Sequence, residues 1–301
     1  MEKVNIEIEK PVAFHELGQR ANNEDSIFPT LNHVDSSNAL FLVCDGVGGA
    51  EKGEMASQLV CQGISNFFNN HCQEMSDAEQ VQKAIAEAQA QIDAYIAKHP
   101  DAKSMASTLT LLHLHKQGAT VAHVGDSRVY HIRNGRILYK THDHSLVNEW
   151  VSTGIITPEE AVNHPKKNVL VRAVVSSQVR EVKADVEIIT DLQPGDHFFL
   201  CTDGVLEHID DETLCLILKQ NISDQEKMNA IRDYGKDINQ DNYSAYLVTL
   251  KKVIWNANKS SDNSSAASDD YENDRLKEQE KQKQPENNLS LISRFIKWFN
   301  F

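Results

Sequence analysis

The chain lacks several features that would place it in a specialised class of protein. None of its five cysteines forms a C-x-x-C pair, a spacing that redox motifs and many zinc sites use. No apolar run approaches the roughly 20 residues that a membrane-spanning helix requires. Lysines and arginines do not cluster with aromatic residues, and the net charge is −14. We therefore expect no transmembrane segment and no nucleic-acid partner.

The cysteines and the first residues of the chain both favour a cytoplasmic protein. The cysteine count is odd, and Cys44 and Cys201 lie in apolar surroundings, which is typical of buried, reduced thiols. Residues 1–10 mix charged and apolar side chains and lack the apolar stretch of a secretory signal. We expect a cytoplasmic location.

Acidic residues beside glycines and asparagines are the most informative feature that is present. They occur in five settings, namely Asn23-Glu24-Asp25, Asp45-Gly46, Gly125-Asp126-Ser127, Thr202-Asp203-Gly204 and Asp241-Asn242. Four of the five lie at or just after a short apolar run, where a strand end followed by a turn directs a side chain into a cleft. Carboxylates that converge in one cleft repel each other unless cations lie among them. The pattern predicts an all-oxygen metal centre built from distant parts of one domain.

The apolar patterns predict many short strands and two long helices. Strands are predicted at 4–9, 40–44, 107–114, 119–124, 128–133, 136–140, 184–190, 196–201 and 243–250. Helices are predicted at 53–69, 77–98, 145–151, 158–162, 211–219 and 224–235. Asn134-Gly135 and Pro194-Gly195 predict turns, and closely spaced strands pair antiparallel. This order predicts an α+β fold with antiparallel sheet layers and helices outside.

The composition changes beyond Trp255. Residues 256–288 contain almost no apolar side chains, which is typical of a disordered linker. In residues 289–301, apolar side chains fall along one helical face. We therefore divide the chain into a domain at 1–252, a polar linker at 253–288 and an amphipathic helix at 289–301. This helix either docks on its own domain or binds a partner or a membrane surface.

The oxygen ligands indicate which metal and which chemistry to expect. Carboxylate and carbonyl oxygens select hard cations such as Mg²⁺ or Mn²⁺. Two such ions bridged by one aspartate can activate a water molecule for in-line attack on phosphorus. Arg20, four residues before Glu24, is placed to hold a substrate phosphate, because a guanidinium fork pairs with phosphate oxygens.

Other metals are disfavoured. The H-x-H stretch His142-Asp143-His144 lacks the further ligands of a zinc site, and no calcium loop of the D-x-D-x-D-G type is present.

Four of the five acidic settings also have a plain structural interpretation. Asn23-Glu24-Asp25 alone is most often a solvated turn, and Asp45-Gly46 is a loop after a strand. Asp126-Ser127-Arg128 is an ion-paired turn, and Asp241-Asn242 is a helix cap or an Asx turn. The joint occurrence of these settings, in this order, favours the metal centre.

Together these stretches resemble the metal-dependent protein phosphatases of type 2C, and most closely their bacterial serine/threonine branch. The resemblance covers about residues 10–251 and rests on Arg20 to Asp25, Val43 to Gly49, Ser107 to Leu109, Val124 to Arg128, Asp143 to Ser145, Cys201 to Gly204, and Asp241-Asn242. It implies a central antiparallel β-sandwich flanked by α-helices in αββα layers. It also implies hydrolysis of phosphoserine and phosphothreonine in proteins by water that a dinuclear metal centre activates.

The resemblance implies roles for the ligands of two core ions, Mn²⁺ or Mg²⁺. Asp45 would bridge both ions. Asp203 and Asp241 would bind the first ion. The backbone carbonyl of Gly46 would bind the second, with Glu24 acting directly or through water.

It also implies supporting roles. Asp25 would support the water shell, and Asp126 with Asp203 would bind a third, weaker ion. Arg20 would grip the substrate phosphate. Residues 145–180 resemble a flap beside the cleft, where substrates are selected.

Some positions depart from the family pattern. Val47 stands where some members carry a histidine that acts as general acid, so metal-bound water or another group must protonate the leaving group. His144 and His123 are candidates, although a structural role is favoured for both. Met105-Ala106 and Val174-Val175 replace glycine-containing stretches, which changes backbone and flap geometry but no ligand.

The leading hypothesis is therefore a protein serine/threonine phosphatase. Its expected partners are phosphorylated proteins, including a cognate serine/threonine kinase. The alternative is a catalytically silent module of the same fold that binds phosphoproteins or a signalling partner.

Overall fold

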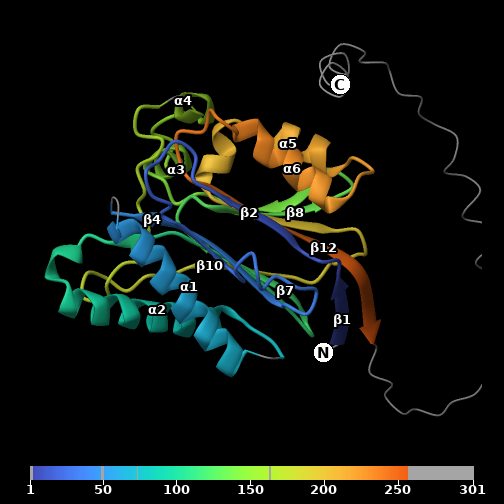
Figure 1. Ribbon diagram of the computed structural model, residues 1–301, viewed down its shortest axis with the longest axis horizontal. Helices are drawn as coiled ribbons and strands as arrows, with labels where there is room; N and C mark the ends of the chain where they lie inside the picture. Colours follow the sequence, from blue (N-terminus) through green and yellow to red (C-terminus); the bar gives the residue numbers. More distant parts are fainter. Residues whose placement is uncertain (1–2, 49–50, 73, 163, 257–301) are drawn as a thin grey trace, which may run out of the picture. The chain divides into compact units, whose positions relative to one another are not determined.

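The strands form two antiparallel sheets that pack face to face, with helices on both outer surfaces (Figure 1). The computed structural model describes residues 3–48, 51–72, 74–162 and 164–256. Within these ranges each sheet has six strands, and all pairings are antiparallel. The predicted α+β sandwich in αββα layers is confirmed.

We name the sheets after their longest strands. The β12 sheet contains β1 (Lys3–Ile8), β2 (Val12–Glu16), β8 (Arg128–Arg133), β9 (Arg136–Lys140), β11 (His197–Cys201) and β12 (Tyr243–Asn256). The β4 sheet contains β3 (Asp25–Phe28), β4 (Leu40–Val47), β5 (Ala106–Ser107), β6 (Leu109–His115), β7 (Gly118–Val124) and β10 (Asp185–Ile189).

The described residues form six α-helices, and two pairs of these helices cover the sheets. They are α1 (Glu51–His71), α2 (Ala78–Lys98), α3 (Leu146–Ser152), α4 (Pro158–Val162), α5 (Asp211–Leu218) and α6 (Asp224–Gly235), with short 3₁₀ segments η1 (Pro100–Ala102) and η2 (Asp203–Glu207). One core joins α1 and α2 to the β4 sheet, and another joins α5 and α6 to the β12 sheet. Figure 1 shows these two helix pairs on opposite sides of the sandwich.

The first five residues of strand β4 are all apolar because the strand is buried on both faces. Leu40, Leu42 and Cys44 pack in the core beneath α1 and α2. Phe41 and Val43 point the other way, into the core between the sheets. Because both faces of the strand are covered, no position before Asp45 is left for a polar side chain.

The two predicted turns have different outcomes. Asn134 and Gly135 have φ angles of 52° and 70°, the left-handed pair that a two-residue hairpin requires, so the hairpin between β8 and β9 is confirmed. Pro194-Gly195 also forms a turn. It does not close a hairpin, because β10 and β11 belong to different sheets.

Several elements differ from the sequence-based prediction. Strands β2 and β3 were not predicted, because VAFHE and DSIF show neither an alternation of apolar and polar residues nor a continuous apolar run. Strand β5 has only two residues and was not predicted as a separate strand. Strand β12 continues six residues beyond Leu250, where Lys251 and Lys252 are exposed and the backbone pairs with β1.

The tail predictions lie almost wholly outside the described residues. The helix at 289–301 and the linker beyond Asn256 fall there, while residues 253–256 belong to β12. None of the helices within the described ranges combines the length and the hydrophobicity needed to cross a bilayer.

A buried ion pair in the β12 sheet gives a testable stability prediction. Asp196 is fully buried and accepts hydrogen bonds from Arg133 at 2.7 Å and His131 at 2.9 Å. Burial alone would raise the pKa of Asp196, but these two partners outweigh it and lower the pKa to about 2. We expect Asp196→Asn to reduce the free energy of unfolding at pH 7 by about 3 kcal/mol, because Arg133 loses its buried partner.

The pH dependence of this effect has a definite sign. A depressed pKa stabilises the fold above the unfolded value of about 4 and loses that contribution as pH falls toward 2. Urea unfolding at pH 7 and pH 3 should therefore show a smaller difference between wild type and Asp196→Asn at pH 3. An equal difference at both pH values would contradict the assignment.

Candidate metal centre

The acidic settings meet at one end of the sandwich. Asp45 lies near the end of β4, Asp126 follows β7, and Asp203 follows β11. One carboxylate oxygen of each residue lies within 4.8 Å of one carboxylate oxygen of each of the other two. We call these three residues the carboxylate cluster. Residues 158 positions apart in the sequence thus form one group, as the sequence-based hypothesis requires.

Burial and mutual repulsion raise the pKa of each carboxyl group in the cluster. For Asp45, burial and then Asp203 hold the pKa well above its usual range. Burial and Asp203 raise the pKa of Asp126 to about 8. Burial and the neighbouring Asp241 raise the pKa of Asp203 to about 6. This arrangement is unfavourable for bare carboxylates and favourable for carboxylates that share cations.

Backbone contacts hold Asp45 in place. Its N–H donates to Thr108 Oγ1 at 2.8 Å, and its carbonyl accepts from Thr108 N–H at 2.8 Å and from Ser107 Oγ at 3.0 Å. Ser107 and Thr108 belong to a motif named in the sequence analysis. Their hydrogen bonds to the Asp45 backbone fix the position of this end of β4.

Glu24 and the carbonyl of Gly46 converge on a second point. A Cβ atom added to Gly53 would lie 1.8 Å from Glu24 Oε2 and 2.8 Å from the Gly46 oxygen. Both oxygens therefore lie beside the space that Gly53 leaves open. The N–H of Gly46 also donates to the carbonyl of Glu24 at 3.0 Å. These are the two ligands that the resemblance implies for the second ion.

Asp241 and Arg20 form the outer edge of the site. Arg20 Nη2 donates to Asp241 Oδ2 at 2.8 Å, and about half of the Arg20 side chain is exposed. Asn242 joins this edge to Glu24, since its Oδ1 accepts the Glu24 N–H at 2.8 Å. Its Nδ2 donates to the carbonyls of Leu17 and Asn22. Asn242 thus ties the segment of Arg20 and Glu24 to the start of β12.

Asp25 lies beneath the cluster, where it joins the two sheets. It is buried, and it is paired in register with Asp45 in the β4 sheet. Its Oδ2 accepts hydrogen bonds from Thr202 and Ser244 of the β12 sheet end. Its Oδ1 is buried and has no hydrogen-bond partner among the described residues. Burial raises the pKa of Asp25 to about 7 despite the two hydroxyl donors.

The residues present fit hard divalent cations. The groups that converge are carboxylate and carbonyl oxygens, and one buried carboxylate oxygen lacks a partner within the described part of the chain. Such a donor set suits Mg²⁺ or Mn²⁺ and not a thiolate- or imidazole-preferring metal.

The histidines near the site are bound within the fold. The His123 and His144 rings stack with centroids 4.4 Å apart, and His123 Nε2 bonds the carbonyl of His142 at 2.8 Å. His144 Nδ1 accepts the Gly125 N–H at 3.1 Å, so its proton is on Nε2, which lies 3.2 Å from Asp185 Oδ2. The hydrogen bond from Gly125 thus occupies the Nδ1 lone pair of His144.

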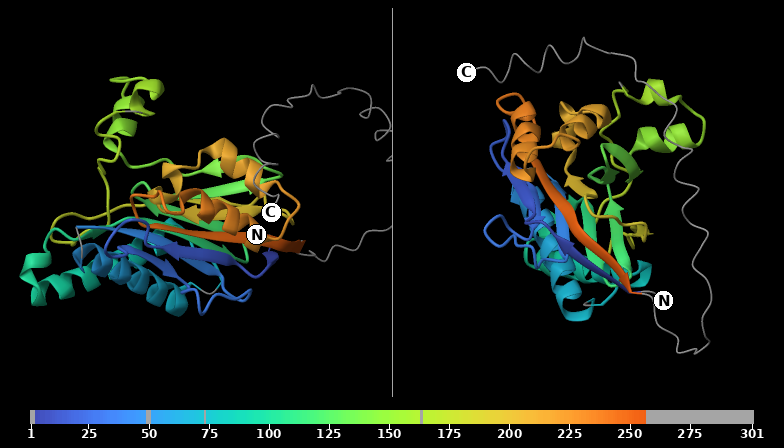
Figure 2. Two further views of the ribbon diagram at one scale, coloured as in Figure 1. Left: turned by 45° about the horizontal axis from the view of Figure 1, so that its top comes forward. Right: turned by 90° about the vertical axis from the view of Figure 1, so that its right-hand side faces the viewer.

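The flap is anchored beside the cluster at both ends. At its start, the N–H of His144 donates to the carbonyl of Gly125, next to Asp126. At its return, Val174 pairs through two backbone hydrogen bonds with Ser107, whose strand pairs with β4 at Gly46. Between these points α3 and α4 stand away from the sandwich, as the left view of Figure 2 shows.

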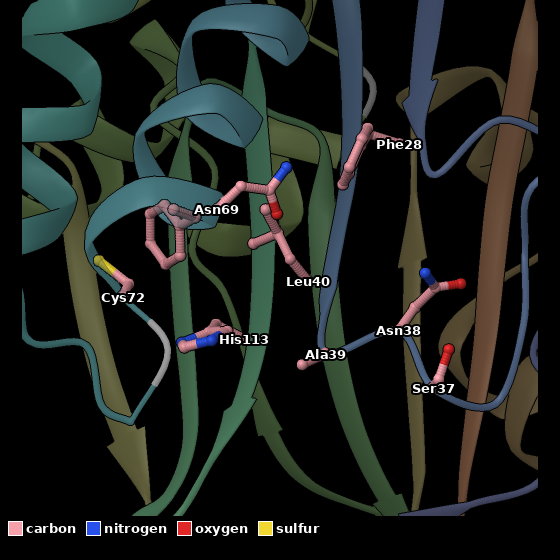
Figure 3. Close-up of a pocket in the computed structure, with 9 residues that line it drawn as sticks. Phe28, Ser37, Asn38, Ala39, Leu40, Asn69, Cys72 and His113 are labelled. Atoms are coloured by element: carbon pink, nitrogen blue, oxygen red, sulfur yellow. The ribbon is translucent and has the colours of Figure 1, made fainter.

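A cavity of about 320 Å³ lies elsewhere on the molecule and plays no part in this site. Figure 3 shows its lining residues, which include Phe28, Leu40, Cys72 and His113. Leu40 is at the opposite end of β4 from Asp45, about 16 Å along the strand. No carboxylate lines this cavity.

Sequence reasoning missed several residues of the site. The sequence analysis counted Gly53 only as part of a helical pattern. The structure shows that a glycine is required there, because any side chain would displace Glu24. Thr202 was quoted only as a neighbour of Asp203, and Ser244 was only part of the strand predicted at 243–250. Their contact with Asp25 depends on strand pairing between distant segments, for which a single sequence gives no signal.

Comparisons with known proteins agree with this geometry. Serine/threonine protein phosphatase PstP of Mycobacterium tuberculosis is 32% identical over 195 residues, a match covering 65% of this chain and 36% of that protein. The chain thus spans about a third of the length of PstP. Serine/threonine phosphatase stp of Listeria welshimeri is 31% identical over 242 residues, which covers 76% of this chain and 90% of that protein.

A solved structure and a family description extend the match. The catalytic domain of serine/threonine protein phosphatase PstP, solved in complex with two manganese ions, gives a TM-score of 0.68 at 26% identity. That match covers 84% of this chain and 100% of the solved chain. The family Protein phosphatase 2C matches residues 15–243. The chain therefore belongs to the protein phosphatase 2C family.

Proposed function

We propose that this protein hydrolyses phosphoserine and phosphothreonine in other proteins. The observation that carries the proposal is the convergence of Asp45, Asp126 and Asp203 within 4.8 Å, beside an exposed arginine. A catalytically silent module of this fold would need at least one missing ligand. Each position proposed as a ligand keeps its oxygen group, so the enzyme is favoured.

The proposed metal ligands divide between the two sheets. Asp45 would lie between two ions, Asp203 and Asp241 would hold one of them, and Glu24 and the Gly46 carbonyl would hold the other. When bound, Mn²⁺ or Mg²⁺ would supply a nucleophile from water at neutral pH and would offset charge on the phosphoryl group.

Two further ligand roles are proposed. Asp126 with Asp203 would hold a third, weaker ion. Asp25, buried below, would support the water shell through its unpartnered Oδ1.

The chain's own residues bind and orient the substrate. Arg20 carries a permanent charge at the open edge of the site and keeps donors available beyond its contact with Asp241. It would pair with phosphate oxygens and hold the phosphorus over the cluster. The flap, residues 145–180, would contact the protein that carries the phosphate. The proton for the leaving alcohol does not come from position 47, since Val47 has no ionisable group.

Arg20 offers a test of the binding step. We expect Arg20→Ala to raise KM for a phosphothreonine peptide about tenfold or more, because a hydrogen bond to a charged group contributes about 1.5–3 kcal/mol. Arg20→Lys should recover only part of the loss, because an ammonium group lacks the planar fork. Steady-state kinetics checks this, and an unchanged KM in Arg20→Ala would contradict the role.

The proposed partners follow from this chemistry. Proteins phosphorylated on serine or threonine are the substrate class, and the serine/threonine kinase that phosphorylates them is the proposed counterpart.

Hydrolysis assays test the proposed function. Purified protein, treated with chelator and then given Mn²⁺, Mg²⁺ or neither, is assayed on p-nitrophenyl phosphate and on matched phosphothreonine and phosphotyrosine peptides. We expect metal-dependent release of phosphate and a preference for phosphothreonine over phosphotyrosine. Wild-type protein that releases no phosphate with either metal would overturn the proposal.

A further inference from the structure

We propose that His15 is a positioning residue for the metal centre, acting through Ser244 to fix the carboxylate of Asp25 and so the spacing between ligands on the two sheets. The inference rests on the proposed metal centre, but it does not depend on which phosphate compound the enzyme hydrolyses.

A continuous chain of hydrogen bonds carries the inference. His15 Nδ1 lies 2.9 Å from Ser244 Oγ, and Ser244 Oγ lies 2.7 Å from Asp25 Oδ2. His15 and Ser244 face each other across the pairing of β2 and β12. Thr202 Oγ1 gives the same Asp25 oxygen a second contact at 3.0 Å, and Thr202 Oγ1 accepts the Ser244 N–H at 3.0 Å.

The direction of each hydrogen bond follows from proton counting. A hydroxyl group has one proton, and Ser244 donates it to Oδ2 of Asp25. Ser244 Oγ must then accept from His15, so Nδ1 of His15 carries its proton. The chain therefore runs one way, from His15 to Ser244 to Asp25. Without His15, the Ser244 hydroxyl is free to rotate away from Asp25.

The chain matters because it crosses between the sheets. His15 and Ser244 belong to the β12 sheet, whose strand ends carry Asp203 and Asp241, whereas Asp25 belongs to the β4 sheet and pairs with Asp45. Ser244 and Thr202 donate hydrogen bonds to Asp25 Oδ2 from the β12 sheet. These bonds also fix the orientation of Oδ1, which has no partner among the described residues. Partners that orient ligands in this way typically contribute about 10–100-fold to metal affinity.

Calorimetric titration of Mn²⁺ into metal-free protein, without substrate, tests the proposal. We expect His15→Leu to weaken the Kd for Mn²⁺ about tenfold. His15→Asn should stay near the wild-type value, because its side-chain N–H can replace Nδ1–H. His33→Leu is the matched control, since His33 is exposed and its Nδ1 hydrogen-bonds Thr30 Oγ1. Circular dichroism confirms that each variant is folded.

A double variant separates positioning from packing. Ser244→Ala should weaken Mn²⁺ binding at least as much as His15→Leu, and the two substitutions together should lose no more than Ser244→Ala alone. Additive losses of Mn²⁺ affinity in the double variant would overturn the proposal, as would equal losses of affinity in His15→Leu and His15→Asn. So would a Kd for His15→Leu within twofold of wild type.

Failure of this inference differs from failure of the proposed function. Wild-type protein that binds Mn²⁺ tightly but releases no phosphate leaves the His15 proposal standing and removes the activity. Wild-type protein that binds no Mn²⁺ overturns both.

Discussion

Replacing Asp45 by asparagine is expected to lower kcat/KM for a phosphothreonine peptide by about 10³-fold or more. Asp45 is the carboxylate shared by the two proposed ions, and metal ions contribute several kcal/mol of charge stabilisation to phosphoryl transfer. An asparagine has nearly the same volume, but it is neutral and coordinates two cations poorly. The loss should fall mainly on kcat when Mn²⁺ is saturating, and stopped assays at several Mn²⁺ concentrations measure it.

Asp101→Asn provides the control for this substitution. Asp101→Asn removes one negative charge, as Asp45→Asn does, but the Asp101 side chain is about three-quarters exposed and pairs with Lys52. It should retain wild-type kinetics. A loss of less than tenfold in Asp45→Asn at saturating Mn²⁺ would contradict the bridging role.

Mn²⁺ should raise the melting temperature of the metal-free protein by about 5–10 °C. At a hundredfold excess over Kd, a bound ion stabilises the fold by about 2.7 kcal/mol. Each kcal/mol shifts the melting temperature of a domain of this size by about 2–4 °C. The effect should be large because the ions also remove the repulsion among Asp45, Asp126 and Asp203.

Asp45→Asn should not lower the melting temperature when no metal is bound. Metal-free Asp45→Asn should melt at or above the temperature of metal-free wild type, because one of the mutually repelling carboxylates is gone. Adding Mn²⁺ should shift the variant much less than the wild type. Differential scanning fluorimetry with chelator and with Mn²⁺ measures both. A variant that is less stable than wild type without metal would show that Asp45 has a structural partner instead.

The fold could be predicted where strands are long and covered on both faces. The run from Leu40 to Cys44 indicated β4 because every position faces a core, and Asn134-Gly135 indicated a hairpin because both residues tolerate positive φ. The sheet in which each strand lies could not be predicted. Strands β10 and β11 are close in sequence but lie in different sheets, and only long-range pairing decides this.

The acidic residues of the site could be predicted from the sequence. Asp45, Asp126 and Asp203 lie near or just after strand ends, so their convergence was inferred from sequence and is seen in the structure. The residues that orient them were not predictable. His15 contacts Ser244, 229 positions away, and its role arises from the pairing of β2 with β12. Neither residue stands out in a short motif.

Anomalous diffraction from crystals grown with Mn²⁺ tests the central claim most directly. The account predicts two strong anomalous peaks about 3.5–4 Å apart with Asp45 between them, one beside Asp203 and Asp241 and the other beside Glu24 and the Gly46 carbonyl. Peaks remote from Asp45, or none at full Mn²⁺ occupancy of the crystal solution, would contradict it.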